Sequence, residues 1–117
     1  MHEKNKKFLN NVTRALRNRG IALAAYSEAD YEDILEMMDD GEDLPDTYQD
    51  WLDLSLETEQ ELLKQGYPVT RIMIQPEKFD SWCRINGLRP NAEARAEFAA
   101  TQAMLKERLK SLNPDNS

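Results

Sequence analysis

The segment 67–75, YPVTRIMIQ, is the only stretch of this chain that reads strongly as a β-strand. Four of its residues are β-branched and favour the extended backbone, namely Val69, Thr70, Ile72 and Ile74. Pro76, directly after it, suits the first turn of a helix. A lone strand cannot hydrogen-bond itself, so 69–75 must pair with another extended segment. Three pairings are open: the segment 21–26 of the same chain, the same strand of a second copy across a two-fold axis, or a strand of another protein.

The segment 21–26, IALAAY, fits either the continuation of a helix or a short strand whose Ile21, Leu23 and Ala25 face one way. We favour the strand, and with it the pairing inside one chain. An isolated two-stranded sheet is marginal in water, so helices must cover at least one of its faces. Such a sheet keeps open outer edges, and a homodimer through 69–75 would extend it to four strands.

Helical spacing of apolar residues dominates the rest of the chain and predicts five helices, over 3–18, 27–41, 46–66, 77–86 and 91–112. The expected N-terminal caps are Ser27, Asp46 and Asn91. The predicted apolar stripes run to the ends of the helices and include Leu56, Leu63, Ile85, Leu105, Leu109 and Leu112. The predicted fold class is therefore α+β: a mostly helical domain of about five helices with a small two-stranded sheet that includes 69–75.

With 117 residues the chain is long enough to form a single core without metal ions or disulfides. We expect one domain over 1–117, with disordered ends at 1–7 and 113–117. Cys83 is the only cysteine, and the longest apolar run, 21–26, is far too short to cross a bilayer. Since the first residues also do not resemble a secretory signal, these features predict a cytoplasmic protein that does not enter membranes.

Charge is distributed unevenly along the chain, whose formal net charge is −7. Residues 1–20 sum to +5, residues 21–63 to −15 with neither lysine nor arginine, and residues 64–117 to +3. Acids one helical turn apart destabilise a helix by roughly 0.2–0.5 kcal/mol per pair, and the middle block predicts five such pairs: Glu28/Glu32, Glu32/Glu36, Glu36/Asp40, Asp53/Glu57 and Glu57/Glu61. Two explanations are open. The acids form a solvated surface balanced by the basic termini, or they meet a basic partner, for which they could imitate a nucleic-acid backbone.

The side chains needed for catalysis are scarce. His2 is the sole histidine, which removes histidine-based triads, histidine-ligated zinc and a histidine proton shuttle. Cys83 falls on the apolar side of a predicted helix and is expected to be a core thiol. The acidic loop around Gly41 does not match a calcium loop, because Met38 falls where an oxygen ligand is required and Thr47 falls where a bidentate Glu is required. We therefore predict that the protein is not an enzyme and has no catalytic, cofactor-binding or metal-binding residue.

These observations predict a small non-catalytic interaction or regulatory protein that binds a protein partner, of basic charge, through an acidic helical surface. The candidate partner-binding residues lie in two predicted helices and in strand 69–75: Glu32, Glu36, Asp50, Asp53, Glu57, Arg71 and Met73.

The alternative is a nucleic-acid-binding regulator that uses basic residues of the predicted helix 3–18, namely Lys6, Lys7, Arg14 and Arg17. The segment 77–112 also has the helix, turn, helix layout of a major-groove reader, with Arg95 early in its second helix. Glu93 and Glu97 flank that arginine, and the overall negative charge repels DNA, so nucleic acid is the weaker prediction.

Overall fold

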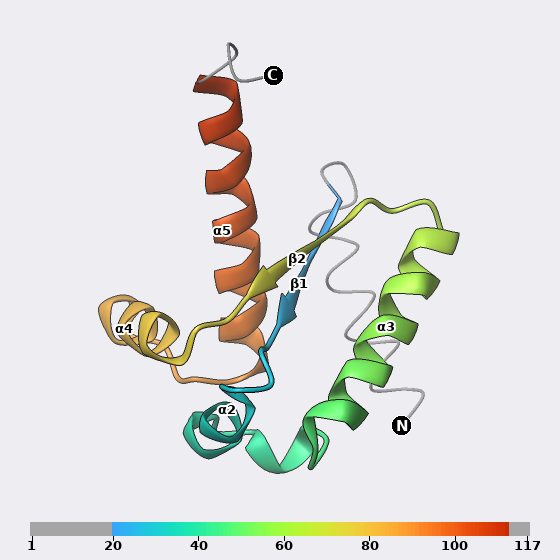
Figure 1. Ribbon diagram of the computed structural model, residues 1–117. Coiled ribbons are helices and arrows are strands. Elements are labelled where there is room, and N and C mark those ends of the chain that lie inside the picture. Colours follow the sequence, from blue (N-terminus) through green and yellow to red (C-terminus); the bar gives the residue numbers. More distant parts are fainter. Residues whose placement is uncertain (1–19, 113–117) are drawn as a thin grey trace.

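The computed structural model describes residues 20–112, which form two strands, four α-helices and one 3₁₀ helix (Figure 1). Their order along the chain is β1 (Ile21–Ala25), α2 (Tyr31–Met37), the 3₁₀ helix η1 (Gly41–Asp43), α3 (Tyr48–Lys64), β2 (Val69–Met73), α4 (Pro76–Asn86) and α5 (Ala92–Leu112). The predicted α+β class is confirmed. The helix predicted over 3–18 and the disordered ends predicted for 1–7 and 113–117 lie outside the described residues.

β1 and β2 pair with each other as a parallel two-stranded sheet, in a register that sets Ile21 opposite Val69. The backbone N–H of Ile21 donates to the carbonyl of Pro68 at 2.8 Å. The prediction that the two segments pair inside one chain is confirmed, as is the interpretation of 21–26 as a strand. Parallel strands cannot be joined by a tight turn. Here the connection consists of α2, η1 and α3.

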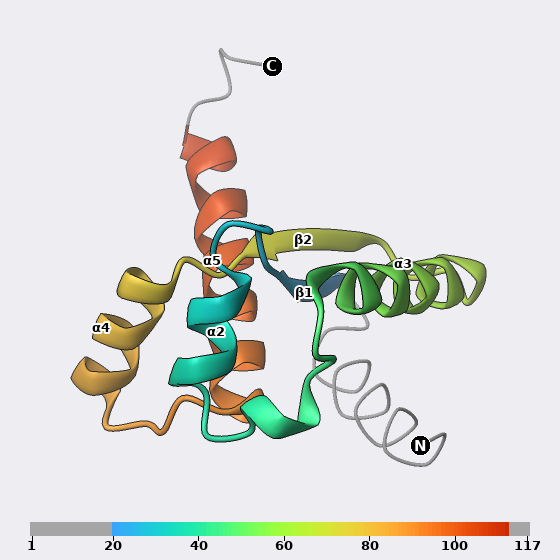
Figure 2. The ribbon, with the colours of Figure 1, turned by 60° about the horizontal axis from the view of Figure 1, so that its bottom comes forward.

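Different helices cover the two faces of the sheet. Ala22 of β1 and Ala103 of α5 line one small cleft, whereas Ile21 and Leu23 cluster with Leu62 of α3. Successive side chains of a strand point to opposite faces, so α5 packs on one face and α3 contacts the other. Figure 2 shows the strands between these two helices.

The main core is rich in aromatic side chains. Phe79 of α4 is fully buried and meets Phe98 of α5 edge to face, with ring centroids 5.5 Å apart. Trp82 packs against the same two rings. A second aromatic group joins β1 to α3, where the rings of Tyr26 and Trp51 lie 4.9 Å apart. These contacts attach the helices before and after β2 to one core.

Cys83 belongs to this core and is 2% exposed. Burial, together with the negative charge of Asp80, raises the pKa of its thiol. Because the thiolate is the reactive form, this environment disfavours nucleophilic chemistry at Cys83. The prediction of a core thiol is confirmed.

The predicted ends of α4 and α5 are confirmed. Pro76 occupies the first turn of α4, and Gly87 ends that helix with a φ of 65°, in the left-handed region that glycine adopts without strain. At the start of α5, the side-chain oxygen of Asn91 accepts the backbone N–H of Ala94 at 3.0 Å. The turn between the two helices is therefore specified locally by the sequence.

The starts of α2 and α3 differ from the prediction by a few residues. The hydroxyl of Ser27 accepts the N–H of Asp30 at 3.2 Å, but it does so in the turn that precedes α2. The cap of α3 is Thr47 rather than Asp46, because the Thr47 hydroxyl accepts the N–H of Asp50 at 3.1 Å. Both residues can cap a helix, and their order alone does not decide between them.

The predicted apolar stripes were too long, because several of their residues lie outside the core and are exposed. Ile85 is 84% exposed, because the short helix α4 turns its Phe79 and Cys83 side to the core. The last turns of α5 extend past the strands (Figure 1). The exposed leucines of the two longest helices are Leu54, Leu56 and Leu63 on α3 and Leu105, Leu109 and Leu112 on α5.

Gly41, at the junction of α2 and η1, leaves no room for a side chain. A Cβ there would lie 2.2 Å from the backbone oxygen of Leu35, so Gly41→Ala must displace the backbone. We expect this variant to lose about 2–3 kcal/mol of unfolding free energy in urea denaturation. The control is Gly66→Ala. A Cβ at Gly66 meets no atom within 4 Å, but the positive φ of this residue is unfavourable for alanine and should cost about 1 kcal/mol. A Gly41→Ala protein as stable as this control would contradict the clash.

Candidate interaction surface

The predicted partner-binding acids lie on the solvent-facing sides of α2 and α3. Glu32 and Glu36 stand one turn apart on α2, and Asp50, Asp53 and Glu57 follow one another along one side of α3. All five side chains are exposed. We refer to these five residues as the acidic surface.

Most acids of the segment 21–63 have no basic partner within residues 20–112. Three of the fifteen form ion pairs there, in the pairs Asp39–Arg89, Asp40–Arg95 and Glu59–Arg71. All five members of the acidic surface are among the other twelve. The described part of the chain therefore leaves this surface largely without compensating charge.

The helices retain some of the predicted like-charge neighbours but not all of them. Asp53, Glu57 and Glu61 stand at successive turns of α3, as do Glu32 and Glu36 of α2. Glu28 and Asp40 lie outside α2, so the helical pairs predicted for them are wrong. Three of the five predicted pairs remain, and each opposes helix formation slightly.

α3 also exposes leucines among its acids. Leu54, Leu56 and Leu63 are 40%, 45% and 52% exposed. The buried residues of this 17-residue helix are Trp51, Ser55 and Leu62, which leaves most of its circumference facing solvent. A surface that mixes acids with exposed leucines suits a partner that carries both basic and apolar side chains.

A groove of about 190 Å³ lies beside α3, between that helix, β1 and the first turns of α5. Its lining is mostly apolar and includes Ala22, Leu23 and Ala24 of β1, Trp51 and Leu54 of α3, and Ala92 and Ala96 of α5. The lining holds no histidine, cysteine or lysine that could activate the hydroxyl of Ser55 as a nucleophile. Its polar lining residues include Asp43, Ser55 and Arg95, and most of the remaining lining is apolar.

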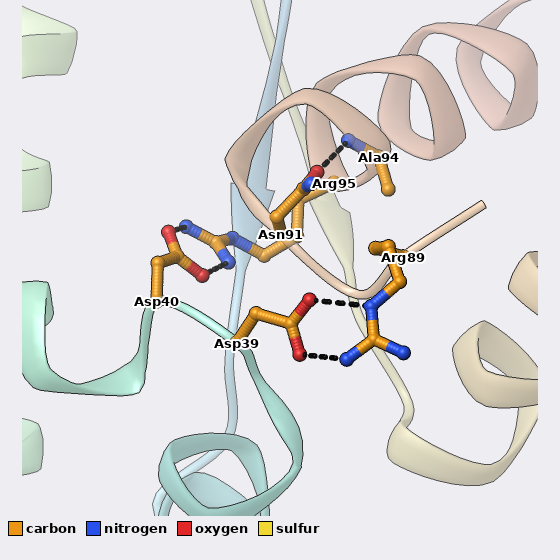
Figure 3. Close-up of polar contacts among 6 residues, drawn as sticks. All are labelled: Asp39, Asp40, Arg89, Asn91, Ala94 and Arg95. Atoms are coloured by element: carbon orange, nitrogen blue, oxygen red, sulfur yellow. Dashed lines mark hydrogen bonds and ion pairs between the residues drawn. The ribbon is translucent and has the colours of Figure 1, made fainter.

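Two adjacent aspartates after α2 bind two arginines near the start of α5 (Figure 3). Asp39 accepts two hydrogen bonds from Arg89, from Nε at 2.8 Å and from Nη2 at 2.7 Å. Asp40 accepts two from Arg95, from Nη1 at 2.7 Å and from Nη2 at 2.9 Å. The geometry of both pairs is bidentate, but their burial differs. The side chain of Arg89 is 77% exposed and that of Arg95 is 9% exposed.

The buried pair changes the protonation equilibria of its members. Burial opposes the ionisation of Asp40, but the hydrogen bonds and the charge of Arg95 outweigh it and hold the pKa of Asp40 below its ordinary value. Burial acts against the charge of Arg95 as well, and there too the hydrogen bonds that Arg95 donates to Asp40 prevail and raise its pKa. Both groups are therefore charged in the folded protein near neutral pH.

Arg95 has a structural role that sequence reasoning missed. Its partner Asp40 lies 55 positions away, so no local spacing indicates the contact. Because its guanidinium is buried and bound to Asp40, Arg95 is not available to a nucleic acid. The other residues proposed for nucleic-acid binding lie outside the described residues, namely Lys6, Lys7, Arg14 and Arg17.

The two candidate residues of β2 differ in their surroundings. Arg71 is half-buried, and its Nε donates to Oε1 of Glu59 on α3 at 2.6 Å. It therefore connects α3 to the sheet. Met73, at the end of β2, is 51% exposed and remains accessible. The homodimer through 69–75 stays a prediction.

No group of three or more His, Cys, Asp or Glu side chains within 20–112 is arranged to hold a metal ion. None of the helices in this range combines the length and the apolar character that crossing a membrane requires.

Comparison of the chain with protein-family models, with curated proteins and with solved structures found no match.

Proposed function

We propose that this protein is a non-catalytic interaction protein that binds a protein partner of basic charge through its acidic surface on α2 and α3. The observation that carries this proposal is that most of the negative charge of 21–63 is not balanced nearby. Twelve of the fifteen acids of this segment have no ion-pair partner within 20–112. Lysines on the same helix sides would have removed the repulsion at no cost to packing.

A basic partner would relieve this repulsion when it binds and would be attracted from a distance. Exposed ion pairs alone contribute little affinity. The exposed leucines of α3 and the apolar groove beside it supply the area that could be removed from water on binding. Charge would thus select the partner and be needed to retain it, and apolar contact would add to the affinity.

The experiment is capture of partners from an extract of the native host, with matched variants of the full chain. Asp50→Lys, Asp53→Lys and Glu57→Lys together reverse the α3 part of the acidic surface. The control makes the same change in net charge at three exposed acids of α4 and α5, with Glu77→Lys, Glu93→Lys and Glu97→Lys.

We expect the wild type and the control to retain the same partner at about 0.05 M salt and to lose it at about 0.5 M, where charges are screened within a few ångströms. The α3 variant should not retain it at either concentration. Equal capture by the α3 variant and the control would refute the proposal, as would capture that salt does not weaken.

A further inference from the structure

The C-terminal half of α5 exposes an apolar strip. Leu105, Leu109 and Leu112 are 47%, 61% and 76% exposed. Their spacings of four and three residues place them on one side of the helix. Met104 and Glu107 still line a small cleft with Ile21 and Thr70. Beyond these turns, Figure 1 shows the end of α5 extending past the strands. A row of three leucines on one helix side is the pattern of a helix that packs against another helix.

Basic residues surround this strip. Lys106, Arg108 and Lys110 are exposed, and none of them forms an ion pair with residues of 20–112. Glu107 is the one acid among residues 104–112. We refer to the three leucines and these three basic residues as the α5 tip.

The α5 tip and the exposed side of α3 are complementary in charge and in spacing. Leu105 and Leu112 are seven residues apart on α5, and Leu56 and Leu63 are seven residues apart on α3. Two helical turns, or about 10.5 Å, therefore separate the leucines on each helix. The three basic residues of the α5 tip are positively charged, whereas Asp53 and Glu57, which lie near Leu56 on α3, are negatively charged.

The two surfaces cannot meet within one chain. In both Figure 1 and Figure 2, the end of α5 points away from the sheet on one side and α3 lies on the other. In a pair of copies, however, the α5 tip of one copy can meet the exposed side of α3 of the other. Two such contacts related by a two-fold axis would cover both surfaces of both copies at once.

We propose that the α5 tip of one copy docks on the exposed side of α3 of a second copy, and that the contact is reciprocal, giving a two-fold dimer. This inference rests on the proposed function, because it takes the acids of α3 as a binding surface. In the dimer, the second copy covers the acids of α3 that a basic partner would bind. Dimerisation and partner binding would therefore compete.

The test measures mass by sedimentation equilibrium in about 0.05 M salt, with two variants of the full chain. The tip variant carries Lys106→Glu, Arg108→Glu and Lys110→Glu, and the face variant carries Asp50→Lys, Asp53→Lys and Glu57→Lys. The wild type is expected to be a dimer at tens of micromolar. Each variant alone opposes like charges at both contacts, so its dissociation constant should rise at least about tenfold.

Mixing the two variants restores opposite charges at both contacts. An equimolar mixture should therefore regain the dimer mass, and so should a chain that carries all six changes. Recovery of the dimer also shows that the variants are folded. A strand-paired dimer through β2 would not respond to changes in the α5 tip.

A monomeric wild type at about 0.1 mM would overturn the inference, and so would dimers that neither variant weakens or a mixture that stays monomeric. Masses that rise beyond the dimer with concentration would refute the reciprocal arrangement. The proposed function is tested separately. If the face variant loses the captured partner while the wild type is monomeric, the partner-binding proposal stands and the dimer does not.

Discussion

Replacing Asp40 by alanine is expected to lower the free energy of unfolding by about 4 kcal/mol. The change leaves the guanidinium of Arg95, whose side chain is 9% exposed, without its counter-ion. Removing one member of a buried pair costs more than the pair itself contributes, because an uncompensated charge remains. Urea denaturation of the wild type and the variant measures the difference.

Asp39→Ala is the matched control. Asp39 receives the same two-hydrogen-bond contact from Arg89, but that arginine is 77% exposed and water replaces the lost carboxylate. Its loss should be several times smaller. The double variant Asp40→Ala with Arg95→Met should recover most of the stability, since it removes the buried charge as well. Equal losses at Asp39 and Asp40 would show that burial does not determine the effect.

The same pair gives an expected pH dependence. Since the pKa of Asp40 is lower in the folded protein than in the unfolded chain, its ionisation stabilises the fold above the unfolded value of about 4. That contribution is lost as the pH falls through the lower, folded value. Between about pH 5 and pH 2, the wild type should therefore lose more stability than Asp40→Asn.

The second large effect is expected at Phe79, where alanine should cost about 4 kcal/mol of unfolding free energy. The side chain is fully buried and contacts the rings of both Trp82 and Phe98. Alanine would lose both ring contacts and leave a cavity at the junction of α4 and α5. The loss is measured by thermal or urea denaturation, with tryptophan fluorescence reporting on Trp51 and Trp82 together.

Ile85→Ala is the control for this change. It lies on the same helix and also removes a large apolar side chain, but Ile85 is 84% exposed. Its effect should stay within about 0.5 kcal/mol. If Ile85→Ala lowered the unfolding free energy as much as Phe79→Ala, the side chain of Ile85 would have to be buried in solution.

The elements were predictable where short-range signals agree. β-branched residues before Pro76 define β2, and Asn91 and Gly87 define the turn between α4 and α5, because turns and caps depend on a few consecutive residues. The parallel direction of the two strands was not predicted. It depends on the path of the whole connection from 26 to 68, which no local signal encodes.

The candidate surface was predictable in its residues but not in its surroundings. A charge map locates Asp50, Asp53 and Glu57, and surface acids on helices stay exposed whatever the fold. It does not indicate that Asp40 is neutralised by an arginine 55 positions away. Apolar spacing likewise identifies a side of a helix without telling which part of it meets the core, so the exposure of Leu109 and Leu112 became clear only from the structure.

The parallel sheet has a consequence for the order of events when the chain is made. Val69 follows its partner Ile21 by 48 positions, so neither strand has a neighbour until most of the polypeptide has left the ribosome. During that interval the apolar residues of β1 and the acidic helices α2 and α3 are synthesised without their sheet partner. Closure of so long a loop comes late and slowly. A nascent chain stopped before residue 69 should thus remain sensitive to protease around 21–26, and one released through residue 112, with α5 present to cover the sheet, should become resistant.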